Sequence, residues 1–187
     1  MMERKEFDRK LILEDGSEYY GYAFGDTSDK VTEIVFNTSM VGYQEIISDP
    51  SYTYQSVVMT YPLIGNYGIA NDDYETDIPT IGGLIVREYN DFPSNFRSKR
   101  TLSEIMEKYH ITGISGVDTR KLTRSIRDLG SRRVLITGLN TSVEEGLKII
   151  EENPYEHDAV KLVSCKSKWR SNVFDARYHI VAIDCGI

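Results

Sequence analysis

The sequence predicts an α+β fold with a β-rich first half and a mixed second half. Runs rich in β-branched and aromatic residues dominate the first hundred residues, whereas helical periodicity with capping signals begins after Arg100. Strand and helix patterns do not alternate regularly, so a doubly wound parallel sheet is not expected for the bulk of the chain. No internal repeat or low-complexity segment interrupts this order.

The β-rich half begins with a predicted hairpin between about Lys10 and Gly25. Two alternating apolar runs are joined by Asp15-Gly16, a dipeptide that readily takes the positive φ angles of a tight turn. Three further strands are predicted from β-branched and aromatic content, each with at least one buried face. These segments are VTEIVFNTS, SVVMTYPLIG and GGLIVREY.

Three helices are predicted in the second half from capping residues that precede apolar residues at helical spacing. Thr101 with Glu104 has the spacing of a capping box and opens the first helix. Asp118 is the predicted N-cap of the second helix, which Gly130 ends. Ser142 repeats the capping-box pattern at the start of the third helix.

Two more strands and a connector complete the predicted second half. The strands are expected in RRVLITGL and in AVKLVSC. Mixed charges and isolated aromatic residues in 166–178 predict a connector. The apolar run 179–187, HIVAIDCGI, looks like the opening strand of a further unit.

Composition excludes several classes of partner. A formal charge of −7 and a pI near 5.0 argue against general attraction to nucleic acid or to an anionic membrane. No apolar run approaches the roughly 20 residues of a spanning helix, and MMERKEFDRK has no signal-peptide core. Two cysteines without zinc spacing fit a reducing cytoplasm. We therefore expect a cytoplasmic protein without nucleic-acid or membrane partners.

No residue is predicted to be catalytic. His110 follows a helix pattern, where an imidazole can interact with the helix dipole, and His157 lies in an acidic turn. No carboxylate or thiol stands at a spacing that would nominate His179 as a general base. Cys185 lacks the Gly-x-nucleophile-x-Gly elbow and is interpreted as a structural cysteine.

Two charged segments are candidate binding sites. The acidic loop ANDDYETD, residues 70–77, has neither EF-hand spacing nor its Gly, so a solvated loop is favoured and no metal site is expected. The segment Arg120–Arg133 concentrates basic residues in an acidic protein. It is either a solvated helix face or a docking surface for an acidic partner. No glycine-rich phosphate loop occurs.

Several blocks, taken in order, resemble the small, glutamine-hydrolysing subunit of carbamoyl-phosphate synthase. They are LILEDGSEYYGYAFG, EIVFNTSMVGYQEIISDPSY, VMTYPLIGNYGI, GLIVREY with SNFR, GISGVDTRKLTRSIRDLG and VAIDCGI. The resemblance extends from about Leu11 to Ile187. It implies a swivelling β/β/α-type fold for the N-terminal domain of that subunit.

The resemblance also implies where the chemistry lies. Residues 1–165 correspond to the N-terminal domain, 166–178 to a connector, and 179–187 to the first strand of a class I glutamine amidotransferase domain. The catalytic Cys, His and Glu of that domain would lie beyond residue 187, so the chain is expected to be a domain cut at its boundary. It is expected to be inactive alone and to hold no cofactor.

The intact subunit is expected to hydrolyse glutamine and to pass ammonia to a large synthetase subunit. That subunit, as the resemblance implies, uses ATP and Mg²⁺ to make carbamoyl phosphate for arginine and pyrimidine synthesis. The expected partners are therefore the large subunit, the amidotransferase domain and glutamine. The basic segment Arg120–Arg133 is expected to contribute to the large-subunit interface because of its charge contrast.

One residue is carried over from the resemblance. The segment Asn37–Gln55, called here the polar segment, is rich in hydroxyls and amides although it lies between two predicted strands. In it, Thr38–Gln44 are expected to shape a turn and a short helix. The resemblance implies that Ser51 of the DPSY motif lies at the edge of the glutamine site. The alternative is that Asp49-Pro50-Ser51 is simply a turn.

Two functions from different classes remain open on these grounds. The chain is either the non-catalytic domain of an amidotransferase subunit or a free-standing β-rich interaction or ligand-binding module without enzyme activity. Continuation of the reading frame past residue 187 into a Gly-x-Cys-x-Gly elbow, with a later His and Glu, distinguishes the first from the second.

Overall fold

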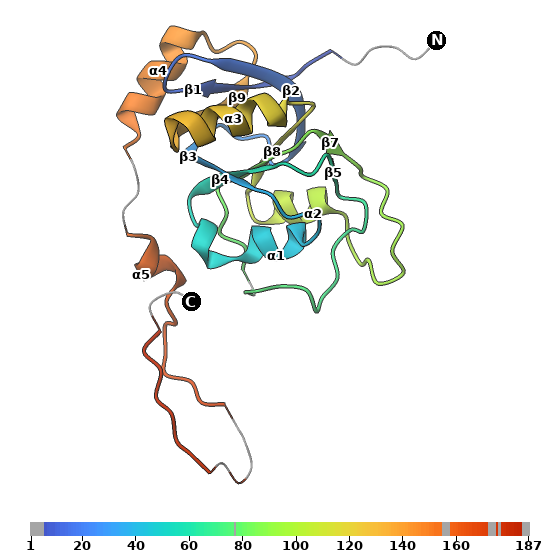
Figure 1. The fold of residues 1–187 in the computed structure, drawn as a ribbon, viewed down its shortest axis with the longest axis vertical. Helices are drawn as coiled ribbons and strands as arrows, with labels where there is room; N and C mark the ends of the chain where they lie inside the picture. The colour runs from blue at the N-terminus through green and yellow to red at the C-terminus, as the bar shows by residue number, and fades with distance from the viewer. Residues whose placement is uncertain (1–5, 77, 155–157, 172–174, 176, 185–187) are drawn as a thin grey trace.

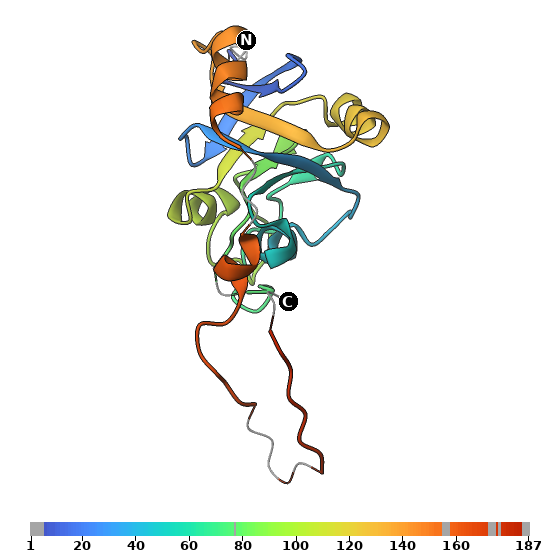
Figure 2. The same cartoon turned by 90° about the vertical axis from the view of Figure 1, so that its left-hand side faces the viewer.

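A computed structural model describes residues 6–76, 78–154, 158–171, 175 and 177–184. Within them, seven strands form a closed barrel in the order β1-β2-β8-β6-β4-β3-β9 (Figures 1 and 2). The barrel strands are β1 Arg9–Leu13, β2 Glu18–Gly25, β3 Lys30–Asn37, β4 Gln55–Met59, β6 Gly83–Ile85, β8 Thr112–Ser115 and β9 Arg132–Gly138. A separate parallel pair consists of β5 Leu63–Ile64 and β7 Glu88–Tyr89.

Short helices surround the barrel (Figure 1). They are α1 Tyr43–Ser48, the 3₁₀ turn η1 Pro50–Tyr52, α2 Leu102–Lys108, α3 Thr119–Leu129, α4 Val143–Glu152 and α5 Ala159–Val163. Helix α2 contacts β2 and β8, α3 contacts β3 and β4, and α4 contacts β1 and β9. The part of the chain that is described contains no helix long and apolar enough to cross a membrane.

Alternate residues of a barrel strand pack into different hydrophobic clusters. In β9, Val134 and Ile136 share a cluster with Leu122 of α3, whereas Leu135 packs with Ile150 of α4. Successive side chains of a strand point to opposite faces, so both faces of β9 are covered. This explains why its sequence is a continuous apolar run rather than an alternating one.

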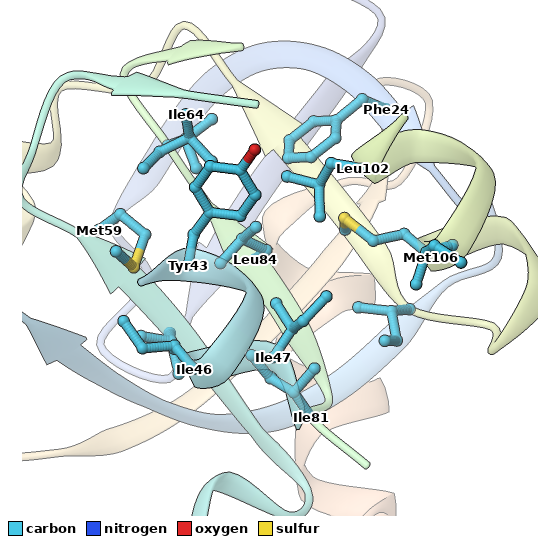
Figure 3. Close-up of a cluster of buried hydrophobic side chains, with 14 of the residues drawn as sticks. Phe24, Tyr43, Ile46, Ile47, Met59, Ile64, Ile81, Leu84, Leu102 and Met106 are labelled. Atoms are coloured by element: carbon cyan, nitrogen blue, oxygen red, sulfur yellow. The ribbon is translucent and has the colours of Figure 1, made fainter. Parts of the chain in front are cut away.

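A further cluster fills the space between the barrel and helices α1 and α2. Figure 3 shows Ile47 of α1 and Leu102 and Met106 of α2 converging near Leu84 of β6. All four side chains are almost fully buried. Each contributes about 1.5–3 kcal/mol relative to an exposed position, so this cluster fixes both helices against the sheet.

The predicted hairpin is confirmed, with a different turn. Strands β1 and β2 pair antiparallel. The Gly16 N–H donates to the Leu13 carbonyl at 2.8 Å, and the Leu13 N–H donates to the Ser17 carbonyl at 3.0 Å. Within the loop between β1 and β2, only Gly16 has a positive φ, 81°. The connection is therefore a three-residue loop with a bulge at Gly16 rather than a two-residue turn.

The predicted helix boundaries are confirmed by their caps. Thr101 and Glu104 form a reciprocal capping box at the start of α2. The Asp118 side chain accepts a hydrogen bond in the first turn of α3, and Gly130 is its C-cap. The Ser142 side chain caps α4. These signals depend on residues within one turn of each other, which is why the sequence reveals them.

The prediction of a strand in AVKLVSC is wrong. Residues Ala159–Val163 form α5, and the Ser164 N–H donates to the Val160 carbonyl at 2.9 Å. The barrel is already closed, so this segment has no strand edge to join. A turn of helix satisfies its backbone groups locally instead.

The apolar run after the connector is not a strand where it is described. Residues 179–184 have no regular secondary structure, and no strand pairs with them within the described residues. An extended segment without a neighbour has no ladder of hydrogen bonds to hold it. Residues 185–187, including Cys185, lie outside the described residues.

Strand β8 is the barrel strand that sequence patterns missed. Its sequence, TGIS, is short and contains a Gly, so neither length nor periodicity distinguishes it from a loop. In the structure β8 pairs with β2 on one side and with β6 on the other. The mixed α and β architecture with a sheet-rich core is confirmed, and β8 closes it.

Close approach of β2 and β8 gives the first prediction. A Cβ at Gly21 would lie 2.2 Å from the Ser115 carbonyl oxygen and 2.7 Å from a side-chain carbon of Ile114. We expect Gly21→Ala to reduce the free energy of unfolding by about 1–3 kcal/mol, measured by urea denaturation, because two strands must move apart.

The matched control is Gly138→Ala in β9, where a Cβ meets nothing within 4 Å. We expect this variant to be unchanged or slightly more stable. Equal effects of the two substitutions would contradict the close contact at Gly21.

Candidate functional site

Ser51 lies on a fixed turn. It is an exposed residue of η1, which directly follows α1. The Asp49 side chain accepts a hydrogen bond from the Ser51 N–H at 2.8 Å, and the Thr53 N–H donates to the Pro50 carbonyl at 3.2 Å. The turn interpretation of Asp49-Pro50-Ser51 is therefore confirmed, and Asp49 closes it.

The Ser51 hydroxyl remains available. Its backbone N–H is used by Asp49, but within the described residues no protein partner of the hydroxyl is found. A serine hydroxyl has one donor and two acceptor sites. It can therefore bind either a carboxylate or an ammonium group of a small polar ligand.

A cleft of about 350 Å³ borders Ser51. Its walls come from β3, η1, β4, β9 and the chain after α4, so they include Glu33, Gln55, Arg133 and Asn153. The Gln55 amide donates to the Glu33 carboxylate at 2.7 Å. Tyr54 also lines the cleft and has a φ of 63°, a left-handed conformation that is costly for a tyrosine.

Of the cleft residues, Ser51 was predicted from the sequence as a site residue, and Arg133 was named only as the end of the basic segment. The lining residues lie on segments separated by more than a hundred positions, and they meet because β3, β4 and β9 are neighbours in the barrel. Their chemistry is that of a binding surface. The described residues that line the cleft supply hydroxyls, two amides, a carboxylate and a guanidinium.

Other side chains of the polar segment form hydrogen bonds with the backbone of the loop 68–75. The buried Gln44 side chain donates to the Ala70 carbonyl at 2.5 Å and accepts from the Ala70 N–H at 2.9 Å. The Tyr43 hydroxyl donates to the Gly68 carbonyl at 2.8 Å, and the Ser48 hydroxyl accepts from the Glu75 N–H at 3.0 Å. Side chains of α1 thus satisfy backbone groups that have no strand or helix partner.

Tyr67, a residue of the same loop, in turn binds the start of α1. The helix starts at Gly42, with a φ of 89° and no side-chain cap. The Tyr67 hydroxyl accepts from the N–H groups of Gly42 at 2.8 Å and Tyr43 at 2.9 Å. These are among the unsatisfied donors of a helix start, so a residue of the loop performs the capping. The rings of Tyr43 and Tyr67 also stack at 4.0 Å.

The helix predicted in the polar segment is therefore present with different limits. The turn occupies residues 38–42, and α1 runs from Tyr43 to Ser48. Its hydroxyls and amides are mostly structural. The Ser51 hydroxyl is exposed beyond the end of the helix and borders the cleft.

Of the three histidines, the structure describes His110 and His179. His110 lies just beyond α2, and its Nδ1 is 2.8 Å from a carboxylate oxygen of Asp26. His179 is exposed, and His157 lies outside the described residues. In the described ranges, no group of three or more His, Cys, Asp or Glu side chains could hold a metal ion.

The two charged segments are partly neutralised by ion pairs. Arg97 lies 2.8 Å from Asp73 and 3.6 Å from Asp72, both in the acidic loop. In the basic segment, Arg132 is buried beside Asp15, and Arg133 pairs with Glu14. The basic segment therefore has two parts, one with arginines in ion pairs on β9 and one with exposed basic residues on α3. Its four exposed basic residues on α3 are Arg120, Lys121, Arg124 and Arg127.

Comparison with known proteins gives one consistent family. The model described as carbamoyl-phosphate synthase small chain, CPSase domain, matches residues 11–136. The carbamoyl phosphate synthase small chain of Staphylococcus epidermidis (strain ATCC 12228 / FDA PCI 1200) is 47% identical over 95% of this chain and 48% of its own length. That of Bacillus caldolyticus is 48% identical over 96% and 49%.

The pyrimidine-specific small chain of Bacillus subtilis (strain 168) is 45% identical over 96% of this chain and 49% of its own length. The chain thus spans about half the length of the curated relatives it matches. Among solved structures, an aminopeptidase from Aneurinibacillus sp. strain AM-1 aligns with a TM-score of 0.38 and 13% identity, over 72% of this chain and 30% of that chain. That likeness is too low to indicate fold or function.

The contact between Gln44 and Ala70 gives the second prediction. Gln44→Leu keeps the bulk of the side chain but leaves the buried N–H and carbonyl of Ala70 without partners. We expect the free energy of unfolding to fall by about 2–4 kcal/mol in urea denaturation. The control Glu45→Gln changes a partly exposed neighbour and is expected to cost less than about 1 kcal/mol. A similarly small cost at Gln44 would contradict the role assigned to its amide.

The buried phenol of Tyr43 gives the third prediction. Burial, with a smaller contribution from Tyr67, raises the pKa of Tyr43 well above its ordinary value of 10.0. The unfolded chain therefore loses this proton near pH 10 while the folded chain keeps it, so stability present below pH 10 is lost as the pH rises further.

We expect Tyr43→Phe to be about 1 kcal/mol less stable at neutral pH, because the bond to Gly68 is lost. Its stability should then fall less steeply than that of the wild type above about pH 10. Urea denaturation across this range tests both effects, and parallel pH profiles would contradict the assignment to Tyr43. Tyr67 remains and also has a raised pKa, so the alkaline loss should be reduced rather than abolished.

Proposed function

Since the chain belongs to the carbamoyl-phosphate synthase small-chain family, we propose that it forms the N-terminal, non-catalytic domain of a glutamine-hydrolysing small subunit. Residues 1–165 form this domain, of the swivelling β/β/α type. Residues 166–178 are the connector, and 179–187 begin the class I glutamine amidotransferase domain. The length of the relatives, about twice that of this chain, supports a second domain of similar size.

The intact subunit hydrolyses glutamine and supplies ammonia to a large synthetase subunit in the cytoplasm. The large subunit uses ATP and Mg²⁺ to combine the ammonia with bicarbonate into carbamoyl phosphate, a precursor of arginine and pyrimidines. The family name and the pyrimidine-specific relative support this assignment.

Ser51 binds one end of the glutamine substrate. The observation that carries this proposal is an exposed hydroxyl without a protein partner among the described residues, held on a closed turn beside a cleft. The cleft is also lined by Asn153, Pro154 and Ala159, where the chain runs on towards its C-terminal part (Figure 2). A domain attached there would face Ser51. The hydroxyl orients the amino-acid end of glutamine and takes no part in bond breaking.

The fourth prediction tests Ser51 in the full-length small subunit. We expect Ser51→Ala to raise the KM for glutamine about 5–50-fold with kcat changed much less, because a binding contact is lost in both ground and transition states. Ammonia release from glutamine is the assay.

Ser94→Ala is the matched control, because Ser94 is exposed on the loop after β7 and does not line the cleft; it should leave KM unchanged. The purified fragment 1–187 should release no ammonia. An unchanged KM for Ser51→Ala would refute the glutamine contact, whereas ammonia release by the fragment would refute its non-catalytic role.

A further inference from the structure

The two peptide groups that flank Ser51 are held by hydrogen bonds. The first has its N–H on Ser51, which donates to the Asp49 carboxylate at 2.8 Å. Its carbonyl, on Pro50, accepts from the Thr53 hydroxyl at 2.7 Å. In the second, the Tyr52 N–H donates to the Asp49 carbonyl at 3.1 Å. Because peptide groups are planar, fixing both planes fixes the direction in which the Ser51 side chain leaves the backbone.

The Thr53 hydroxyl has a second partner, Thr80, and the direction of that bond follows from the available hydrogens. The two hydroxyl oxygens are 2.7 Å apart. A carbonyl oxygen only accepts, so the single hydrogen of the Thr53 hydroxyl is used by Pro50. The Thr80 hydroxyl therefore donates to the Thr53 oxygen. Thr53 is buried, so little water competes for either bond.

Thr80 is itself fixed by its position just before the barrel strand β6. Its carbonyl accepts from the Tyr54 N–H at 3.3 Å, and the next residue, Ile81, forms an antiparallel bridge with Thr53. Ile81 is buried in the same cluster as Ile47 of α1 (Figure 3). A hydroxyl from a distant part of the sequence, attached to the barrel, therefore supports the turn that carries Ser51.

Thr80 lies behind the wall of the cleft rather than in it. Ser51, Thr53 and Tyr54 line the cleft, whereas Thr80 does not. Thr80 would therefore act on a ligand in the cleft through the residues that it holds, without touching the ligand. A small displacement of a binding group is enough to weaken such a contact, because hydrogen bonds depend steeply on distance and angle.

We propose that Thr80 is a positioning residue for glutamine binding: by donating to Thr53, its hydroxyl holds the turn that directs the Ser51 hydroxyl at the substrate. This inference rests on the proposed function, because it presupposes that Ser51 binds glutamine. A hydroxyl held in place before the substrate arrives does not have to be ordered on binding, which favours affinity. Thr80 thus contributes to the affinity for glutamine without contacting it.

The fifth prediction compares variants of Thr80 in the full-length small subunit, with ammonia release from glutamine as the assay. Thr80→Val replaces the hydroxyl by a methyl group of similar size. We expect it to raise the KM for glutamine about 3–10-fold with kcat changed much less, because one hydrogen bond behind a binding contact is lost. Thr80→Ser keeps the hydroxyl and should keep the wild-type KM. Thr80→Ala should show the same rise as Thr80→Val and replaces it if that variant does not fold.

Thr141→Val is the matched control for a general loss of stability. The hydroxyls of Thr137 and Thr141 are 2.9 Å apart, so this variant also removes a bond between two threonines, but neither residue lines the cleft. We expect the midpoint of urea denaturation to fall by similar amounts in Thr141→Val and Thr80→Val, whereas KM should rise only in Thr80→Val. An equal rise of KM in both variants would assign the effect to destabilisation and overturn the proposal.

A double variant tests whether Thr80 acts through Ser51. In a Ser51→Ala background, Thr80→Val should raise KM no further, because the hydroxyl that Thr80 positions is gone. An additive rise would mean that Thr80 acts by another route, and the proposal would be wrong.

The single variants separate this inference from the proposed function. If Ser51→Ala raises KM and folded Thr80→Val does not, the inference fails and the glutamine contact of Ser51 stands. If Ser51→Ala leaves KM unchanged, the glutamine contact fails and this inference fails with it.

Discussion

Pairing of β8 with β2 on one side and β6 on the other closes the barrel, and the other elements are placed against that closed sheet. Closure encloses an interior cluster completed by Leu122 and Ile126 of α3. It leaves the outer faces to α1, α2 and α4. It also leaves no free edge on the barrel strands, so residues 159–163 and 179–184 have no barrel edge to join.

The second constraint is the mutual support of α1 and the loop that follows β5. A helix of six residues is too short to be stable alone, and α1 has no side-chain cap. Its Tyr43, Gln44 and Ser48 bind the backbone of residues 68–75, while Tyr67 caps its first turn. The polarity of the polar segment is therefore the polarity of a structural contact. Burial of these groups makes each bond costly to remove.

This contact also bears on the position of Ser51. By fixing α1, it fixes the Asp49-Pro50-Ser51 turn that follows the end of the helix. A destabilised α1 would therefore disturb the cleft that Ser51 borders.

The sequence by itself determined the elements whose signals are local. The hairpin at Gly16, the caps at Thr101, Asp118 and Ser142, and the turn at Asp49 each depend on groups within a few residues, so their patterns survive in the bare chain. Its sequence blocks also resemble those of the carbamoyl-phosphate synthase small subunit, so the family could be predicted from the sequence. Only the tertiary structure decided the barrel, because pairing Phe24 with Gly113 joins segments that no local period relates. Non-local strand pairing also assembled the cleft around Ser51, and closure of the barrel left residues 159–163 without a barrel edge to join.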